Sequence, residues 1–152
     1  MGLENLQDDV SDIELKQRWR LYWIHAIFEF SNVKLQKMAW VEPEKTQWPD
    51  EVWDSSYEAC ISAYFDTLAL DDAYKKAVEV GNVTKEEAEM AQEFHTLAAW
   101  YMEPSSEAME IINDEEWLEV VEAAQGFWNF LKAEVSAPRE KALIAKLEAD
   151  YA

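Results

Sequence analysis

The chain has 152 residues, and 32 Asp and Glu against 13 Lys and Arg give it a formal net charge of −19 at pH 7. So large an acidic excess excludes direct binding to nucleic acid, because contacts to phosphates require a basic surface. Apolar residues make up 49% of the chain and aromatic residues 13%, which excludes a disordered chain.

Only three Gly and four Pro occur, and so few turn-forming residues favour long helices with short links over a β-rich fold. We therefore predict an all-α fold, a bundle of five or six helices with short connections. No shift in composition divides the chain, so we expect a single acidic helical domain over residues 1–152, with residues 1–10 as a flexible N-terminal segment.

The first predicted helix runs from residue 11 to about residue 36 and begins with a capping box over residues 11–14. Its middle is apolar on nearly every side, so we expect it to lie at the centre of the bundle. A narrow polar stripe follows its helical spacing, and we treat this stripe either as an ordinary hydrogen-bonded face or as the lining of a small-molecule pocket. The stripe consists of Arg18, Tyr22, His25, Glu29 and Asn32, of which the first four are the candidates to line a pocket.

Residues 40–50 contain two prolines and read as a loop, after which helices are predicted over 50–70 and 73–80. Gly81 is expected to close the second of these. A capping box at residues 84–87 opens a helix to about residue 102, and a short segment follows it to residue 112. The last two predicted helices cover residues 114–135 and the chain from Pro138 to near residue 152.

The acidic charge is unevenly distributed along the chain. Residues 1–41 hold six acids and five bases, whereas residues 42–152 hold 26 acids and eight bases. Between Lys85 and Lys132 there are twelve acids and no Lys or Arg. Like charges one turn apart destabilise a helix, so this arrangement has an energetic cost. It is either a solvated face that maintains solubility or a docking surface for a basic partner.

Six of these acids recur at helical spacing, and we predict that they form one electrostatic binding face. They are Glu86, Glu89, Glu93, Glu115, Glu119 and Glu122. Trp100 shares the polar side of its helix, so we predict that it is exposed and anchors an interface.

Neither catalytic residues nor metal ligands are predicted, and no cofactor is expected. The residues three before His25 and His95 are Tyr22 and Gln92, so the Glu-x-x-His pairs of di-iron bundles are absent, and the single cysteine cannot complete a Cys and His zinc cluster. An alternative is an all-helical, Mg²⁺-dependent nucleotide pyrophosphohydrolase, which holds its metal through paired carboxylates. Pairs at that spacing are Glu51–Asp54, Glu86–Glu89, Glu107–Glu110 and Glu119–Glu122. However, the absence of Lys and Arg from 86 to 131 leaves phosphates few partners.

The leading hypothesis is a non-enzymatic acidic binding protein of the inhibitor or immunity type, which docks a basic-surfaced protein and in one version mimics a nucleic acid. An exposed apolar face could instead form a homodimer. The N-terminus lacks the features of a signal peptide, no apolar run is long enough to span a membrane, and Cys60 has no intrachain partner. We therefore expect a cytoplasmic protein without membrane contacts.

Overall fold

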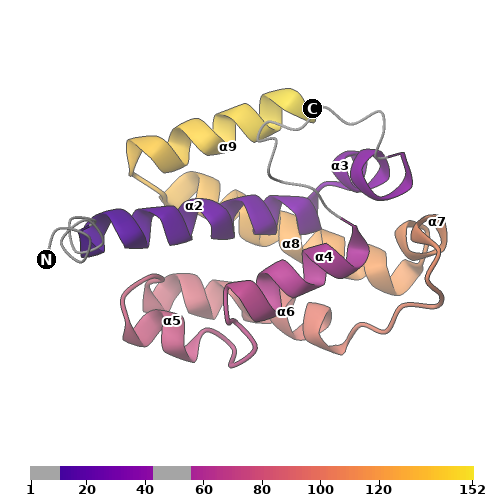
Figure 1. Cartoon of the computed structure of the whole chain (residues 1–152), viewed down its shortest axis with the longest axis horizontal. Helices are drawn as coiled ribbons and strands as arrows, with labels where there is room; N and C mark the ends of the chain where they lie inside the picture. Colours follow the sequence, from indigo (N-terminus) through magenta and orange to yellow (C-terminus); the bar gives the residue numbers. More distant parts are fainter. Residues whose placement is uncertain (1–10, 43–55) are drawn as a thin grey trace, which may run out of the picture.

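The computed structural model describes residues 11–42 and 56–152, and within them every regular element is a helix (Figure 1). The prediction of an all-α bundle with about six substantial helices is confirmed. The predicted flexible segment 1–10 and most of the loop at 40–50 lie outside the described residues. The helices are α2 (Asp12–Ser31), α3 (Val33–Gln36), α4 (Tyr57–Ser62), α5 (Lys75–Glu79), α6 (Lys85–Trp100), α7 (Ala108–Ile112), α8 (Glu115–Glu134) and α9 (Pro138–Asp150), and π-helical turns η1 (Lys37–Val41) and η3 (Ala63–Thr67) extend α3 and α4.

Helix α2 is the centre of the bundle, as its apolar sequence predicts. It packs against α8 along much of its length and also contacts α9, α4 and η3 (Figure 1). All of its residues from Trp23 to Ser31 are buried. A helix that is apolar on nearly every side is stable only when other elements cover it on nearly every side.

The first helix ends earlier than predicted. Asn32 leaves the helical conformation, with φ −124° and ψ 102°, and its side-chain Oδ1 accepts a hydrogen bond from the backbone N–H of Leu35 at 2.8 Å. Asparagine competes with helical backbone hydrogen bonds in this way and favours cap positions. The predicted continuous helix to residue 36 is therefore two helices, α2 and α3.

Three local signals at helix ends are confirmed. Thr84 and Glu87 form the reciprocal capping box at the start of α6, and Pro138 lies in the first turn of α9. Gly81, with φ +83°, follows α5 in the left-handed conformation that favours glycine. Helix α5 is shorter than predicted because Ala73 and Tyr74 also have positive φ, so the helix begins only at Lys75.

Aromatic side chains fill the core. Trp117 of α8 is fully buried and lies between 5.1 and 5.9 Å, centroid to centroid, from the rings of Phe30, Trp40, Tyr57 and Tyr101. This cluster joins α2, η1, α4 and α8, so it fixes the position of α8 relative to the central helix. Such pairs add stability beyond the area that they bury.

Candidate functional site

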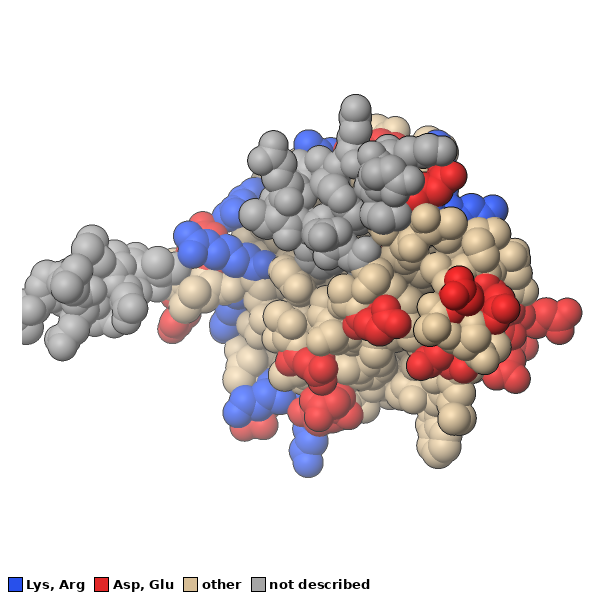
Figure 2. Space-filling model, turned by 45° about the vertical axis from the view of Figure 1, so that its right-hand side comes forward, with Lys and Arg blue, Asp and Glu red and all other residues tan. Residues whose placement is uncertain are grey.

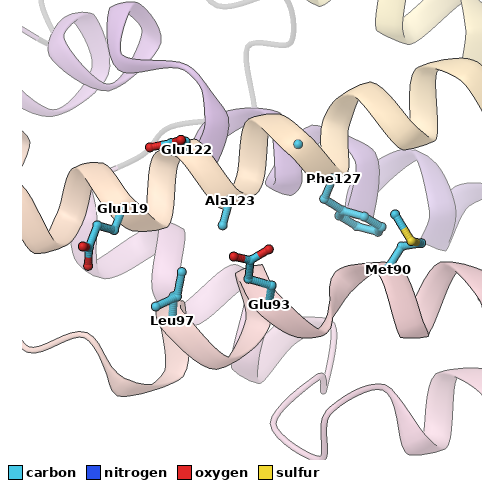
Figure 3. Close-up of a pocket in the computed structure, with 8 residues that line it drawn as sticks. Met90, Glu93, Leu97, Glu119, Glu122, Ala123 and Phe127 are labelled. Carbon is cyan, nitrogen blue, oxygen red and sulfur yellow. The ribbon is translucent and has the colours of Figure 1, made fainter.

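A groove of about 550 Å³ runs between α6 and α8. Both apolar and carboxylate side chains line it, and Figure 3 shows Glu93 and Leu97 of α6 facing Ala123 and Phe127 of α8. The lining residues are Met90, Glu93, Leu97, Glu119, Glu122, Ala123, Gly126 and Phe127.

The spacing along each helix explains which side chains reach the groove. On α6, Ala91, Phe94 and Ala98 are buried in the core, so the neighbouring row at positions 90, 93 and 97 faces α8. On α8 the core row contains Val120, Ala124 and Phe127, and the row beside it at 119, 122, 123 and 126 faces α6. The groove is therefore the seam between two amphipathic helices, left open at its outer side.

Three of the six predicted face residues meet at this groove. Glu93 comes from α6, whereas Glu119 and Glu122 come from α8, and all three are exposed. In Figure 3 Glu93 points from α6 towards α8, and Glu119 points from α8 towards α6. No Lys or Arg is among the described residues that line the groove. It therefore presents negative charge beside apolar side chains, with no basic side chain in its lining.

The other three predicted residues do not line the groove. Glu86 and Glu89 are exposed near the start of α6, and Glu115 is exposed in the first turn of α8. They lie on the same two helices, so they extend the acidic surface without shaping the groove. Figure 2 shows one face of the molecule, with carboxylates over its right-hand and lower parts and much of the basic charge on its left-hand part.

Glu87, an acid of the stretch between Lys85 and Lys132, pairs with an arginine from a distant part of the chain. The Arg20 guanidinium of α2 donates two hydrogen bonds of 2.8 Å to Glu87, two of 2.9 and 3.0 Å to Glu140 of α9, and one to the carbonyl of Asn82. Burial lowers the pKa of Arg20, but its bonds to the two carboxylates outweigh this and raise it overall. This cluster was missed in the sequence, although an Arg in a largely buried central helix signals buried acidic partners.

Trp100 is 81% exposed at the end of α6, as predicted, and Met102 just beyond it is also 81% exposed. Trp100 follows Glu93 by seven residues and Leu97 by three, so it lies on the groove side of α6, about one turn beyond the groove. Its exposure is confirmed, while its role as an interface anchor stays a prediction.

The polar stripe on α2 passes from the surface into the core. Arg18 is exposed, and its Nε lies 3.1 Å from Glu14. Tyr22 is half-buried, whereas His25 and Glu29 are buried, and Glu29 accepts a hydrogen bond of 2.9 Å from Trp40 Nε1. The four residues thus occupy different surroundings, and their role in a small-molecule pocket stays a prediction.

A second hollow of about 600 Å³ lies between α4 and α6 and was not expected from the sequence. Tyr57 and Tyr101 line it, and their hydroxyls donate hydrogen bonds to Glu103 at 3.1 Å and Asp114 at 2.8 Å. Burial raises the pKa of both phenols, and the carboxylate partners raise it further, so both stay neutral. Because these tyrosines belong to the cluster around Trp117, the hollow is also the outer edge of the core.

Over residues 11–42 and 56–152, no group of three or more His, Cys, Asp and Glu side chains is arranged to hold a metal ion. Of the four predicted pairs, Glu51–Asp54 lies outside the described residues. His95, the second histidine, is buried with its Nδ1 2.8 Å from the Tyr64 hydroxyl, and burial lowers its pKa.

No helix in the described part of the chain is long and apolar enough to cross a membrane. Comparison of the chain with protein-family models, curated proteins and solved structures finds no match.

Proposed function

We propose that this protein is a non-enzymatic acidic binding protein, of the inhibitor or immunity type, that docks a basic-surfaced protein partner at the groove between α6 and α8. One observation carries the proposal: Glu93, Glu119 and Glu122, from two helices, line one groove together with apolar side chains, and no described Lys or Arg lines it. Long basic side chains match such a surface because their stems are apolar and their heads are charged.

The electrostatics favour rapid capture of that partner. Complementary charge steers diffusional encounter and raises association rates toward about 10⁸–10⁹ M⁻¹s⁻¹ at low salt. A second copy of this chain is a poorer occupant, because the groove carboxylates of the two copies would face each other across the interface and repel. Trp100, beside one end of the groove, supplies the exposed aromatic that interface hot spots often contain.

The test is affinity capture from the source organism with three immobilised forms of the full chain. The forms are the natural chain, a groove variant with Glu93→Gln, Glu119→Gln and Glu122→Gln, and a control variant with Glu79→Gln, Glu134→Gln and Asp150→Asn. Both variants lose three negative charges, and the control changes only exposed carboxylates outside the groove. We expect the natural chain and the control to retain the same basic protein and the groove variant to lose it.

The identified partner is then titrated at about 50 and about 150 mM salt, and we expect its affinity for the natural chain to fall as salt rises. A partner that the groove variant retains equally well, or whose affinity is indifferent to salt, contradicts the proposal. A nucleotide hydrolysis assay with and without Mg²⁺ addresses the enzymatic alternative, since turnover that requires Mg²⁺ would overturn the non-enzymatic part.

A further inference from the structure

We infer that the segment seated in this groove is an amphipathic basic α-helix whose backbone crosses α8 at Gly126. The inference rests on the proposed function and specifies the form of the partner. The fold of this chain leaves one feature unexplained, namely a glycine in the interior of the 20-residue helix α8.

Gly126 lies in the middle of α8, twelve residues after its N-cap Asp114 and eight before its last residue. A glycine there is less stable than an alanine, because it loses more conformational freedom on folding. A Cβ built on Gly126 would meet no atom within 4 Å. No contact within the described structure therefore requires a residue without a side chain at this position. Gly126 is exposed and lines the groove. The absence of a Cβ leaves space in which the backbone of a partner can approach α8 closely.

The shape and backbone of the groove favour a helix as the occupant. Its walls are two helices whose backbone groups are already paired internally, so they offer no free edge to which an extended strand could add. A helix satisfies its own backbone and needs only a complementary face. The lining positions span residues 119–127 on α8, which corresponds to about 12 Å and so to about two turns of a partner helix.

The charge pattern determines the faces of that helix. Both helices contribute carboxylates to the lining, Glu93 from α6 and Glu119 and Glu122 from α8, and Leu97, Ala123 and Phe127 contribute apolar groups beside them. A complementary helix therefore carries a narrow strip of apolar and small residues, flanked on both sides by Lys or Arg. This arrangement corresponds to the helix-in-groove mode of peptide recognition.

The probe is a synthetic helical peptide of about 14 residues, built from Leu, Ala and Lys with the Lys on both flanks of one apolar strip. A peptide of identical composition and scrambled order is the comparison. Binding to the full chain is measured by fluorescence anisotropy. We expect the amphipathic peptide to bind at least about tenfold more tightly than the scrambled one.

The decisive variants are Gly126→Ala and Gly126→Leu, with Ala145→Leu at an exposed position of α9 as the control for added bulk. We expect Gly126→Ala to raise the Tm and to lower the affinity for the amphipathic peptide. We expect Gly126→Leu to lower that affinity by at least about tenfold. The control should bind as the natural chain does. Because a Cβ at position 126 has open space, a loss of binding accompanied by an unchanged or higher Tm reports the close approach and not misfolding.

The outcomes separate this inference from the function on which it rests. Equal binding of the two peptides, or absence of saturable binding by the amphipathic one, overturns the helical occupant. Unchanged binding in Gly126→Leu overturns the crossing at Gly126. In each case a natural partner that the Glu→Gln groove variant loses would still support the proposed function. If the natural partner is indifferent to the groove carboxylates, the proposed function fails.

Discussion

Arg20 of α2 and Glu87 of α6 are 67 residues apart in the chain, yet both terminal guanidinium nitrogens of Arg20 lie 2.8 Å from carboxylate oxygens of Glu87. Glu140 of α9 occupies the other side of the same guanidinium. One largely buried cation, with its side chain 17% exposed, thus joins three helices. It also separates Glu87, which maintains the fold, from the exposed carboxylates of the same helix, which are available to a partner.

Removal of this cation should destabilise the protein strongly. Arg20→Leu leaves two carboxylates with side chains only 8% and 5% exposed and without their counter-ion. Loss of one partner from a buried ion pair typically costs about 3–5 kcal/mol, so we expect a decrease of that size in the free energy of unfolding, measured with urea. The control Arg18→Leu, whose side chain is 59% exposed, should change it by less than about 1 kcal/mol. Equal effects of the two variants would show that the Arg20 cluster is dispensable.

The same cluster predicts a pH dependence at the acidic end. Burial raises the pKa of Glu87, but hydrogen bonds from Arg20 and Thr84 lower it more, and the net pKa lies below the ordinary 4.5. A carboxyl whose folded pKa is lowered contributes stability above its unfolded pKa and loses that contribution as pH falls through the folded value. The stability difference between the natural chain and Glu87→Gln should therefore be constant above about pH 5 and shrink below about 4.5. Urea unfolding at a series of pH values measures it, and a difference that does not change with pH contradicts this assignment.

His95 predicts a separate change at higher pH. Its imidazole is buried beside the Tyr64 hydroxyl and the Tyr74 ring, and this burial lowers its pKa below 6.5, against an opposing effect of Asp72. The neutral ring is therefore favoured in the folded state. As pH falls below about 6.5 the unfolded state binds the proton first, so the free energy of unfolding decreases in that window. NMR titration of the ring should give a pKa under 6.5, and a value above it would contradict the prediction.

Trp100 and Trp117 should respond to truncation in opposite ways. Trp100 of α6 is 81% exposed, whereas Trp117 of the neighbouring helix α8 is fully buried. We expect Trp100→Ala to change the free energy of unfolding by less than about 0.5 kcal/mol. Trp117→Ala should cost about 3–5 kcal/mol.

For the affinity for the partner we expect the opposite order, with the truncation of Trp100 having the larger effect. Trp100→Ala folds normally and should weaken binding of the captured partner if this side chain is an interface anchor. Urea unfolding and a binding titration on the same protein samples distinguish the two contributions. Full affinity in Trp100→Ala would show that its exposure has no role in docking.

The amino-acid sequence by itself determined the helices and most of their ends, because those signals act over a few residues. The capping box at Thr84 and Glu87, Pro138 at the start of α9 and Gly81 after α5 each act through local hydrogen bonds or local φ preferences. Asn32 is equally local, and its tendency to cap a new helix was underestimated when the first helix was predicted to continue to residue 36.

Only the tertiary structure decided which acids face one another. Helical periodicity places Glu119 and Glu122 on one side of α8 and Glu93 on one side of α6, but it does not say which way either helix is turned within the bundle. That rotation depends on how the core side chains around α2 and Trp117 pack, and these contacts join residues far apart in the chain. The same packing pairs Glu87 with Arg20 and leaves Glu93, Glu119 and Glu122 around an open groove, so a uniform run of acids in the sequence becomes two sets with different roles.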